Sequence, residues 1–226
     1  MVVSNEKVLI KKLKSLVRLF RDNRHAELEV IVGCSDKKGK FRAGTNQEVF
    51  DNFIASIGKG IVSDSSGVWS DFVGEELTAT YYFSDGVRGR FTGVSPPVFV
   101  RKELLGRVDI QCSNKASNLR VTVKNEVPVV GYKFLTKPVS VRLHCRTSVT
   151  YKGIWRFEAS PVSQGKDKEE ACANPETREI EADCLRTALG SLSNEALAKH
   201  LLWRGGDILG RYEGDNIVNP DLFISG

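Results

Sequence analysis

Two short carboxylate-bearing segments, far apart in the chain, are the residues best suited to do chemistry. In the segment AELEVIVG, Glu27 and Glu29 occupy alternate positions of a β-like run, and in REIEADC, Glu179 and Glu181 repeat the pattern. A strand places residues i and i+2 on one face, so each pair holds two like charges together. If a closed sheet brings the two strands side by side, the four carboxylates require a hard divalent cation, Mg²⁺ or Mn²⁺.

Basic residues alternate in the same way along the strands expected between these segments. They share one parity of each strand, sometimes with a carboxylate or a hydroxyl: Arg88 and Arg90; Arg120 with Glu126; Arg142, His144 and Arg146; and Arg156 with Glu158 and Ser160. Such alternation also describes the solvated face of an ordinary sandwich. In a closed barrel one parity points into the lumen, and these rows would then line a charged tunnel suited to a metal ion and a triphosphate. No Walker-type phosphate loop is present.

The elements that must position these residues are mostly short strands. Period-two segments bounded by Gly, Pro, Ser and Asn favour an antiparallel barrel or sandwich, with strands expected at 78–83, 87–92, 98–102, 108–112, 119–123, 139–145, 154–160 and 179–184. Helical spacing predicts an amphipathic helix over 4–22 with Ser4 as its N-cap, a helix over 47–57, and a helix over 194–203 that Gly205 and Gly206 end. Residues 163–178 are expected to form an exposed loop.

Composition narrows the class of protein. The chain has 226 residues, 41% of them apolar and 27% charged, which is typical of a globular protein, and its net charge of +5 is modest. Five widely spaced cysteines without a CxxC pair argue against a disulfide framework and favour a reducing compartment. No segment resembles a signal peptide or a membrane span. We expect one domain over residues 1–226, in an intracellular protein that does not enter membranes.

The motifs between about Glu27 and Cys184 resemble, in order, those of the metal-dependent RNA 5′-triphosphatases of fungi, protozoa and large DNA viruses. ELEVIVG resembles the first Glu-x-Glu motif of that family, YYFSDGVRGRF and VRKELLGRVDI its Arg- and Lys-bearing strands, and NLRVTVKNE its Arg…Glu strand. VRLHCRTS, IWRFEASPV and REIEADC resemble the last three motifs. These enzymes are triphosphate tunnel metalloenzymes, which remove the γ-phosphate of nascent RNA in mRNA capping. The resemblance therefore implies an α+β, mainly antiparallel fold: a closed eight-stranded barrel with flanking helices, its tunnel core spanning about 26–185 and a helical segment following at about 190–210.

The resemblance also implies roles for individual residues. Metal ligands would be Glu27, Glu29, Glu179 and Glu181, holding Mg²⁺ or Mn²⁺. Phosphate binding and charge stabilisation would fall to Arg88, Lys102, Arg142, His144 and Arg146. Glu126 would position the attacking water, and the tunnel floor and substrate contacts would involve Arg90, Arg120, Arg156, Glu158 and Ser160. The chain departs from the family pattern at His144, where Lys is usual, and at Asp183, where a third Glu is common.

Implied substrates are the 5′-triphosphate end of nascent RNA and nucleoside triphosphates, and the implied partner is an RNA guanylyltransferase. The implied location is the nucleus, or a viral factory or virion for a viral protein. Two alternatives stay open at this point: the same tunnel could hydrolyse small polyphosphates such as tripolyphosphate or thiamine triphosphate, or a non-catalytic barrel could bind polyanions. Four convergent carboxylates argue against the last alternative, because an anion binder has no use for them.

Overall fold

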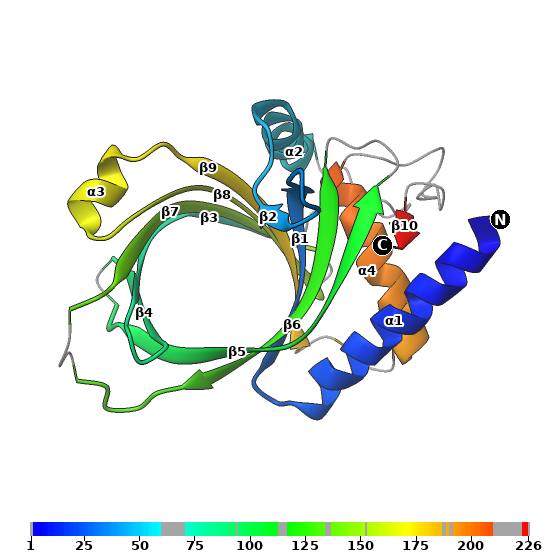
Figure 1. The fold of residues 1–226 in the computed structure, drawn as a ribbon, viewed down its shortest axis with the longest axis horizontal. Coiled ribbons are helices and arrows are strands. Elements are labelled where there is room, and N and C mark those ends of the chain that lie inside the picture. The colour runs from blue at the N-terminus through cyan, green and yellow to red at the C-terminus, as the bar shows by residue number, and fades with distance from the viewer. Residues whose placement is uncertain are drawn as a thin grey trace.

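Eight antiparallel strands close into a barrel in the computed structural model, which describes residues 2–59, 71–93, 95–112, 117–133, 137–151, 153–186, 189, 192–209 and 223–225. The barrel strands are β1 (Ala26–Ser35), β3 (Asp71–Tyr82), β4 (Val87–Thr92), β5 (Val98–Cys112), β6 (Asn118–Pro128), β7 (Ser140–Tyr151), β8 (Trp155–Gly165) and β9 (Thr177–Cys184). The ring closes because β1 pairs with β6 on one side and with β9 on the other, and Figure 1 looks along its axis. Two short strands, β2 (Phe41–Ala43) and β10 (Phe223–Ser225), pair with β1 and β5 outside the ring.

In the described parts of the chain, four helices accompany the barrel: α1 (Val2–Asp22), α2 (Gln47–Lys59), α3 (Lys168–Ala173) and α4 (Asn194–Leu209). In Figure 1, α1 and α4 cross the outside of the wall next to β1 and β6, whereas α3 lies at the far end of β8 and β9. Within the described residues, no helix is long and apolar enough to span a bilayer. The closed eight-stranded barrel with flanking helices confirms the predicted fold class.

The hydrophobic core lies between the outer face of the barrel wall and the helices. Leu28 and Val30 of β1 alternate with the two glutamates, and both are fully buried against the helices. Leu13 of α1 and Leu201 of α4 are fully buried in the same core. Because strand residues alternate between faces, packing these apolar residues outward forces the charged parity into the lumen.

Helix α1 is an amphipathic helix, as its spacing predicts, and its apolar stripe packs on the barrel. Leu9, Leu13 and Phe20 are almost completely buried, whereas Val8 is 48% exposed. The helix begins at Val2, so the expectation that Ser4 is its N-cap is wrong. At its other end, Arg186 donates to the carbonyl oxygens of Asn23 (2.7 Å) and Ala26 (3.3 Å), which joins the helix to β1.

Two further sequence expectations need correction. The expected exposed loop over 163–178 contains the end of β8, helix α3 and the start of β9; Asp167 caps α3 by accepting a hydrogen bond from the backbone N–H of Glu170 at 2.8 Å. Helix α4 does not end at its two glycines but continues through them to Leu209, while Ser193 caps its start by accepting from the N–H of Ala196 at 3.1 Å.

Several expected boundaries also change. The segments expected at 98–102 and 108–112 form one strand, β5, which contains a bulge between Leu104 and Gly106. Some positions of these expectations lie outside the described residues: residues 94 and 113–116 between expected strands, and residues 190, 191 and 210 of the C-terminal helical segment.

Candidate active site

The lumen of the barrel holds a polar cavity of about 150 Å³. Strand register explains its lining: across β1 and β6, Glu27 lies opposite Lys124 and Glu29 opposite Thr122, and paired residues of antiparallel strands share a face. Most residues predicted from the sequence line this cavity: Glu29, Arg88, Arg90, Lys102, Glu126, Arg142, His144, Arg146, Glu158, Ser160, Glu179 and Glu181.

Three predicted residues are not part of this lining. Glu27 is next to it, with its carboxylate 3.0 Å from Lys102 Nζ. Arg156 shares the inward parity of Glu158 on β8 but lies further along the strand, and its Nε contacts Glu158 at 2.7 Å. Arg120 shares the inward parity of β6 but lies further along the strand, where Asp109 holds its guanidinium.

Lys124, Thr80 and Tyr82 also line the cavity, although they are not among the residues predicted from the sequence. The signal for Lys124 was present in the sequence, since it stands between Thr122 and Glu126 on the parity already assigned to the lumen. Thr80 and Tyr82 are neutral residues at alternate positions of β3, and they carry no charge that would distinguish them from residues of a solvated face.

Lysines of β5 and β6 contact the carboxylates of β1. Lys102 of β5 contacts both Glu27, at 3.0 Å, and Glu126. Lys124 of β6 contacts Glu29, whose Oε2 also accepts a hydrogen bond from Thr122 Oγ1 at 3.1 Å. Burial raises the pKa of Glu29 even with Lys124 beside it, because the carboxylate is almost entirely removed from water.

Arginines of β7 and β8 contact the carboxylates of β8 and β9. Arg142 forms an ion pair with Glu179, and Arg146 Nε lies 3.0 Å from Glu158 Oε2. Arg156 bridges two acids, with Nε 2.7 Å from Glu158 Oε1 and Nη2 2.8 Å from Asp183 Oδ2. The part of the barrel formed by β1, β8 and β9, which we call the acidic wall, therefore carries carboxylates that are separated by cations.

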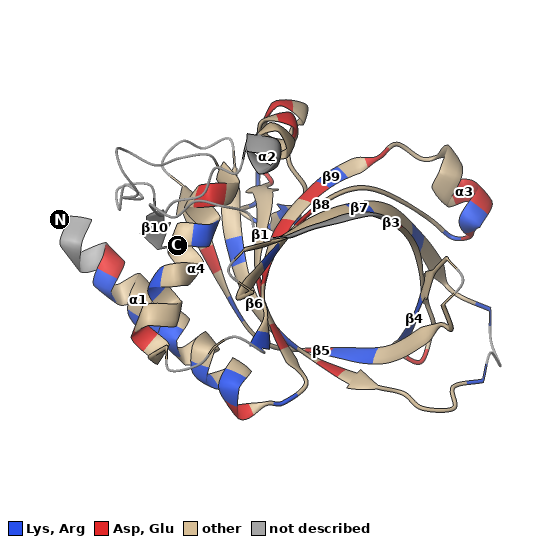
Figure 2. Cartoon of the chain, turned by 180° about the vertical axis from the view of Figure 1, so that it is seen from behind, with Lys and Arg blue, Asp and Glu red and all other residues tan. Residues whose placement is uncertain are grey.

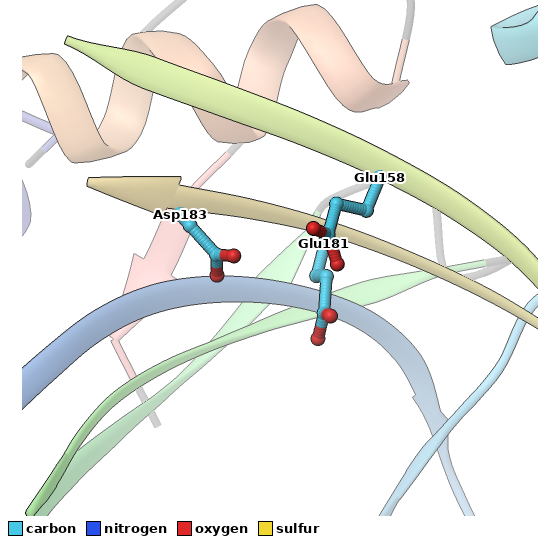
Figure 3. A group of neighbouring side chains, drawn as sticks. All are labelled: Glu158, Glu181 and Asp183. Carbon is cyan, nitrogen blue, oxygen red and sulfur yellow. The ribbon is translucent and has the colours of Figure 1, made fainter. Parts of the chain in front are cut away.

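Three carboxylates of this wall converge. Oxygens of Glu158, Glu181 and Asp183 lie within 4.8 Å of one another, and Figure 3 shows the three side chains projecting from β8 and β9 toward the same region. Asp183 lies opposite Glu29 in the β1–β9 register. Both carboxylate oxygens of Glu158 are buried and make no hydrogen bond of good geometry, although two arginines are near.

The electrostatics of the cluster follow from burial and like charge. Burial and the neighbouring Asp183 and Glu181 raise the pKa of Glu158 to about 9, and burial with Glu181 and Glu29 raises that of Asp183 to about 7. Burial also disfavours ionised Glu181, but the neighbouring Glu158 carboxyl, which is protonated near pH 7, and the charge of Arg146 outweigh this effect, so the pKa of Glu181 is lowered. Protons thus neutralise part of the cluster, which is the role a bound cation takes in a carboxylate site.

Cations of β4 line the cavity away from the acidic wall, and Figure 2 shows Lys and Arg in blue on β4 and β5 with Asp and Glu in red on β9. Among the described residues, no carboxylate lies within ion-pair distance of Arg88 or Arg90; the Arg88 guanidinium lies 5.1 Å from the ring centre of Tyr82. A cationic surface that lacks internal counter-ions is suited to a multiply charged anion such as a phosphate chain.

His144 lies between Arg142 and Arg146 on the inner face of β7. Burial together with these two guanidiniums lowers the pKa of His144 to about 4, so its imidazole is neutral near pH 7. Its Nε2 is 3.1 Å from Thr80 Oγ1. The residue that replaces the usual lysine therefore contributes a neutral hydrogen-bonding group rather than a charge.

Comparison with known proteins relates this barrel to solved structures. No protein-family model matches the chain, and no curated protein matches it in sequence. The structure is similar to the S. pombe Pct1 RNA triphosphatase, with a TM-score of 0.69 and 15% identity over 92% of this chain and 93% of that one. A structure of Pct1 in complex with the Spt5 CTD matches with a TM-score of 0.70 and the same identity and coverage. The RNA triphosphatase domain of a trifunctional mimivirus mRNA capping enzyme matches with a TM-score of 0.58 and 14% identity, over 88% of this chain and 96% of that one. The chain therefore has the fold of these fungal and viral RNA triphosphatases.

Proposed function

We propose that the protein is a divalent-metal-dependent RNA 5′-triphosphatase, which hydrolyses the bond between the β- and γ-phosphates of 5′-triphosphate RNA as the first step of mRNA capping. The observation that carries this proposal is the lumen, where a carboxylate cluster on β8 and β9 faces cations of β4 and β7 inside a closed barrel. The fold shared with RNA triphosphatases supports the same activity.

The acidic wall fits a hard cation on structural grounds. Three carboxylates converge within 4.8 Å, and the buried oxygens of Glu158 have no well-formed hydrogen bond to satisfy them. Mg²⁺ and Mn²⁺ take oxygen ligands, and Glu181, Asp183 and Glu29 of the adjacent strands would hold the ion with Glu158 beside it. Glu27 of β1, which contacts Lys102, and Glu179 of β9, which contacts Arg142, stay predicted ligands. The bound ion would neutralise charge on the γ-phosphate.

The remaining residues of the lumen would act on the phosphate chain directly. Arg142 and Arg146 present planar guanidiniums that bind two phosphate oxygens at once, and Arg88 and Lys102 approach from β4 and β5. Because these groups are already held by β-strands, they stabilise the charge of the transition state without reorganising. Glu126, in contact with Lys102, would orient the attacking water and accept its proton.

A panel of substrates tests the proposal. Phosphate release is measured from γ-labelled triphosphate RNA, from ATP and from tripolyphosphate, each with Mg²⁺ and with Mn²⁺. We expect triphosphate RNA to be hydrolysed with the highest kcat/KM, and ATP to be hydrolysed best with Mn²⁺. Turnover of tripolyphosphate alone would make the protein a small-polyphosphate hydrolase, and binding without turnover of any substrate would make it a polyanion-binding barrel; either result contradicts the proposal.

The proposed reaction leaves a 5′-diphosphate RNA end, which is the substrate of a guanylyltransferase. We therefore propose that a guanylyltransferase acts next, in the nucleus or, for a viral protein, in a viral factory. Co-purification with a guanylyltransferase activity from the source cells, measured as GMP transfer to diphosphate RNA, tests this partnership.

A further inference from the structure

A second cavity, of about 330 Å³, continues from the lumen between β1, β2, β5 and β6. Arg88, Lys102 and Lys124 line both cavities, so a ligand held by these cations extends directly from one into the other. The second cavity continues along β6 to Arg120, four residues from Lys124, which corresponds to about 13 Å of extended strand. It therefore offers space beyond the phosphate-binding lumen.

Arg120 presents a rigid, planar surface in this second cavity. Asp109 of β5 accepts two hydrogen bonds from its guanidinium, from Nε at 2.6 Å and from Nη2 at 2.8 Å. The guanidinium carbon lies 4.3 Å from the centre of the Phe41 ring, so one face of the plane rests on an aromatic residue. Gly33 makes room for this arrangement, because a Cβ at that position would be 2.4 Å from the Phe41 ring.

Two contacts thus fix the plane of Arg120, while the residue still contributes to the wall of the cavity. A guanidinium in a fixed plane stacks well on a flat aromatic ligand, and nucleobases bind to arginine planes in this manner. An inorganic polyphosphate has no flat face, and Asp109 already neutralises the charge of Arg120. The arrangement therefore favours a ligand that carries a base next to its phosphates.

We propose that the second cavity binds the first nucleoside of a 5′-triphosphate substrate, with its base stacked on the Arg120 guanidinium. The triphosphate would lie in the lumen, and the nucleoside would occupy the space between Lys124 and Arg120. The inference rests on the proposed function for the placement of the triphosphate, and it specifies a nucleoside-bearing substrate in preference to inorganic tripolyphosphate.

The test compares Arg120→Lys with wild type on triphosphate RNA, ATP and tripolyphosphate. Loss of one stacking contact weakens binding by roughly tenfold or more, so we expect the ratio of kcat/KM for ATP over tripolyphosphate to fall by that factor, with a similar fall for triphosphate RNA. Lysine keeps the positive charge but lacks the planar group, so Arg120→Lys should not retain the wild-type ratio. Arg101→Lys, on the outer face of β5, is the matched control and should leave the ratio unchanged.

Asp109→Asn provides an independent variant should Arg120→Lys fail to fold, since it keeps Arg120 and removes the charge that fixes its plane. We expect it to lower the same ratio. An unchanged ratio in a folded variant overturns the inference. An effect on RNA without one on ATP also overturns it, because the cavity would then hold a later nucleotide.

Equilibrium dialysis separates this inference from the proposed function. If Arg120→Lys weakens binding of labelled ATP but not of labelled tripolyphosphate, the nucleoside site stands even for a protein that hydrolyses neither. If the wild-type protein hydrolyses triphosphates but binds ATP and tripolyphosphate with equal affinity, the proposed function stands and the nucleoside site is overturned.

Discussion

Arg142 and Arg146 lie two residues apart on β7, and each contacts a carboxylate of the acidic wall while lining the lumen. We expect Arg142→Ala and Arg146→Ala each to lower kcat for triphosphate RNA by roughly a hundredfold, within the range for loss of one preorganised charge contact. Arg→Lys should recover little, because an ammonium cannot make the paired contact of a guanidinium. Arg101→Ala, outside the barrel, serves as the control. Near-normal kcat in either alanine variant at saturating substrate would show that β7 does not contact phosphate.

Asp183 completes the carboxylate cluster with Glu158 and Glu181, although it was not among the ligands predicted from the sequence. If the cluster holds Mn²⁺, the ion stabilises the folded protein by about 2.7 kcal/mol at a hundredfold excess over its Kd. We expect Mn²⁺ to raise the Tm of wild type by several degrees and to leave that of Asp183→Asn unchanged. Glu48→Gln, on α2, is the control and should keep the full increase. The change in Tm is measured by thermal unfolding monitored with circular dichroism. If Mn²⁺ raises the Tm of Asp183→Asn as much as that of wild type, the ion binds elsewhere.

His144 should make the stability of the protein depend on pH. Burial and the neighbouring Arg142 and Arg146 lower its pKa to about 4 in the folded protein, whereas an unfolded histidine titrates near 6.5. Between these values the unfolded chain binds a proton that the folded chain does not, so this contribution is complete above pH 6.5 and is lost as the pH falls toward 4. For a partly buried group we expect about 1–2 kcal/mol.

Urea unfolding at pH 7.5 and pH 4.5 measures this contribution. His144→Gln cannot take up the proton, so its free energy of unfolding should fall by about 1–2 kcal/mol less than that of wild type between the two pH values. An equal fall in both proteins would mean that His144 becomes protonated in the folded barrel as easily as in the unfolded chain.

At the scale of elements, helix α4 shows how close packing overrides a local sequence signal. Gly205 and Gly206 were expected to end the helix, yet it passes through them, and Gly205 packs against Leu119 of β6 where a side chain would not fit. A Cβ on Gly205 would lie 2.3 Å from Cδ1 of Leu119. We expect Gly205→Ala to lower the free energy of unfolding by about 1–3 kcal/mol, because overpacking outweighs the better helix propensity of alanine.

Lys199→Ala, at an exposed position of the same helix, provides the comparison for this prediction, and urea unfolding of both variants measures the difference. If Gly205→Ala is as stable as Lys199→Ala or more so, the close contact between α4 and β6 is not maintained in solution.

Strand parity could be predicted from the sequence, whereas strand irregularities could not. Alternation was sufficient to assign Glu29, Arg142 and Glu181 to the inner face of their strands, because the residues of the opposite parity are mostly apolar and lie on the outer face of the barrel. The bulge in β5 shifts the alternation by one residue, so Lys102 and Arg107 both face inward although they are five residues apart. Helix α3 was not predicted either. Its N-cap, Asp167, lies in a highly charged segment in which a capping residue does not stand out from the other charges.

In the molecule as a whole, the lumen is charged and the hydrophobic core lies outside the barrel. This core lies under α1 and α4, which cross the outer wall in Figure 1. The sequence predicted most of the charges that line the lumen, but not Lys124 and not how the charges pair there. The convergence of Glu158 with Asp183 depends on the β8–β9 register and on Arg156 between the two acids, and neither follows from spacing alone.

The most direct test of the central claim, that the lumen is a metal-dependent triphosphatase site, is the initial rate of phosphate release from γ-labelled triphosphate RNA with Mn²⁺ and with EDTA. Wild type should release phosphate only with the metal. Glu27→Ala, Glu29→Ala and Glu181→Ala should each be inactive under both conditions while unfolding cooperatively, because each removes a carboxylate from the acidic wall. Undiminished release in EDTA, or full activity of Glu29→Ala and Glu181→Ala with Mn²⁺, would contradict the account.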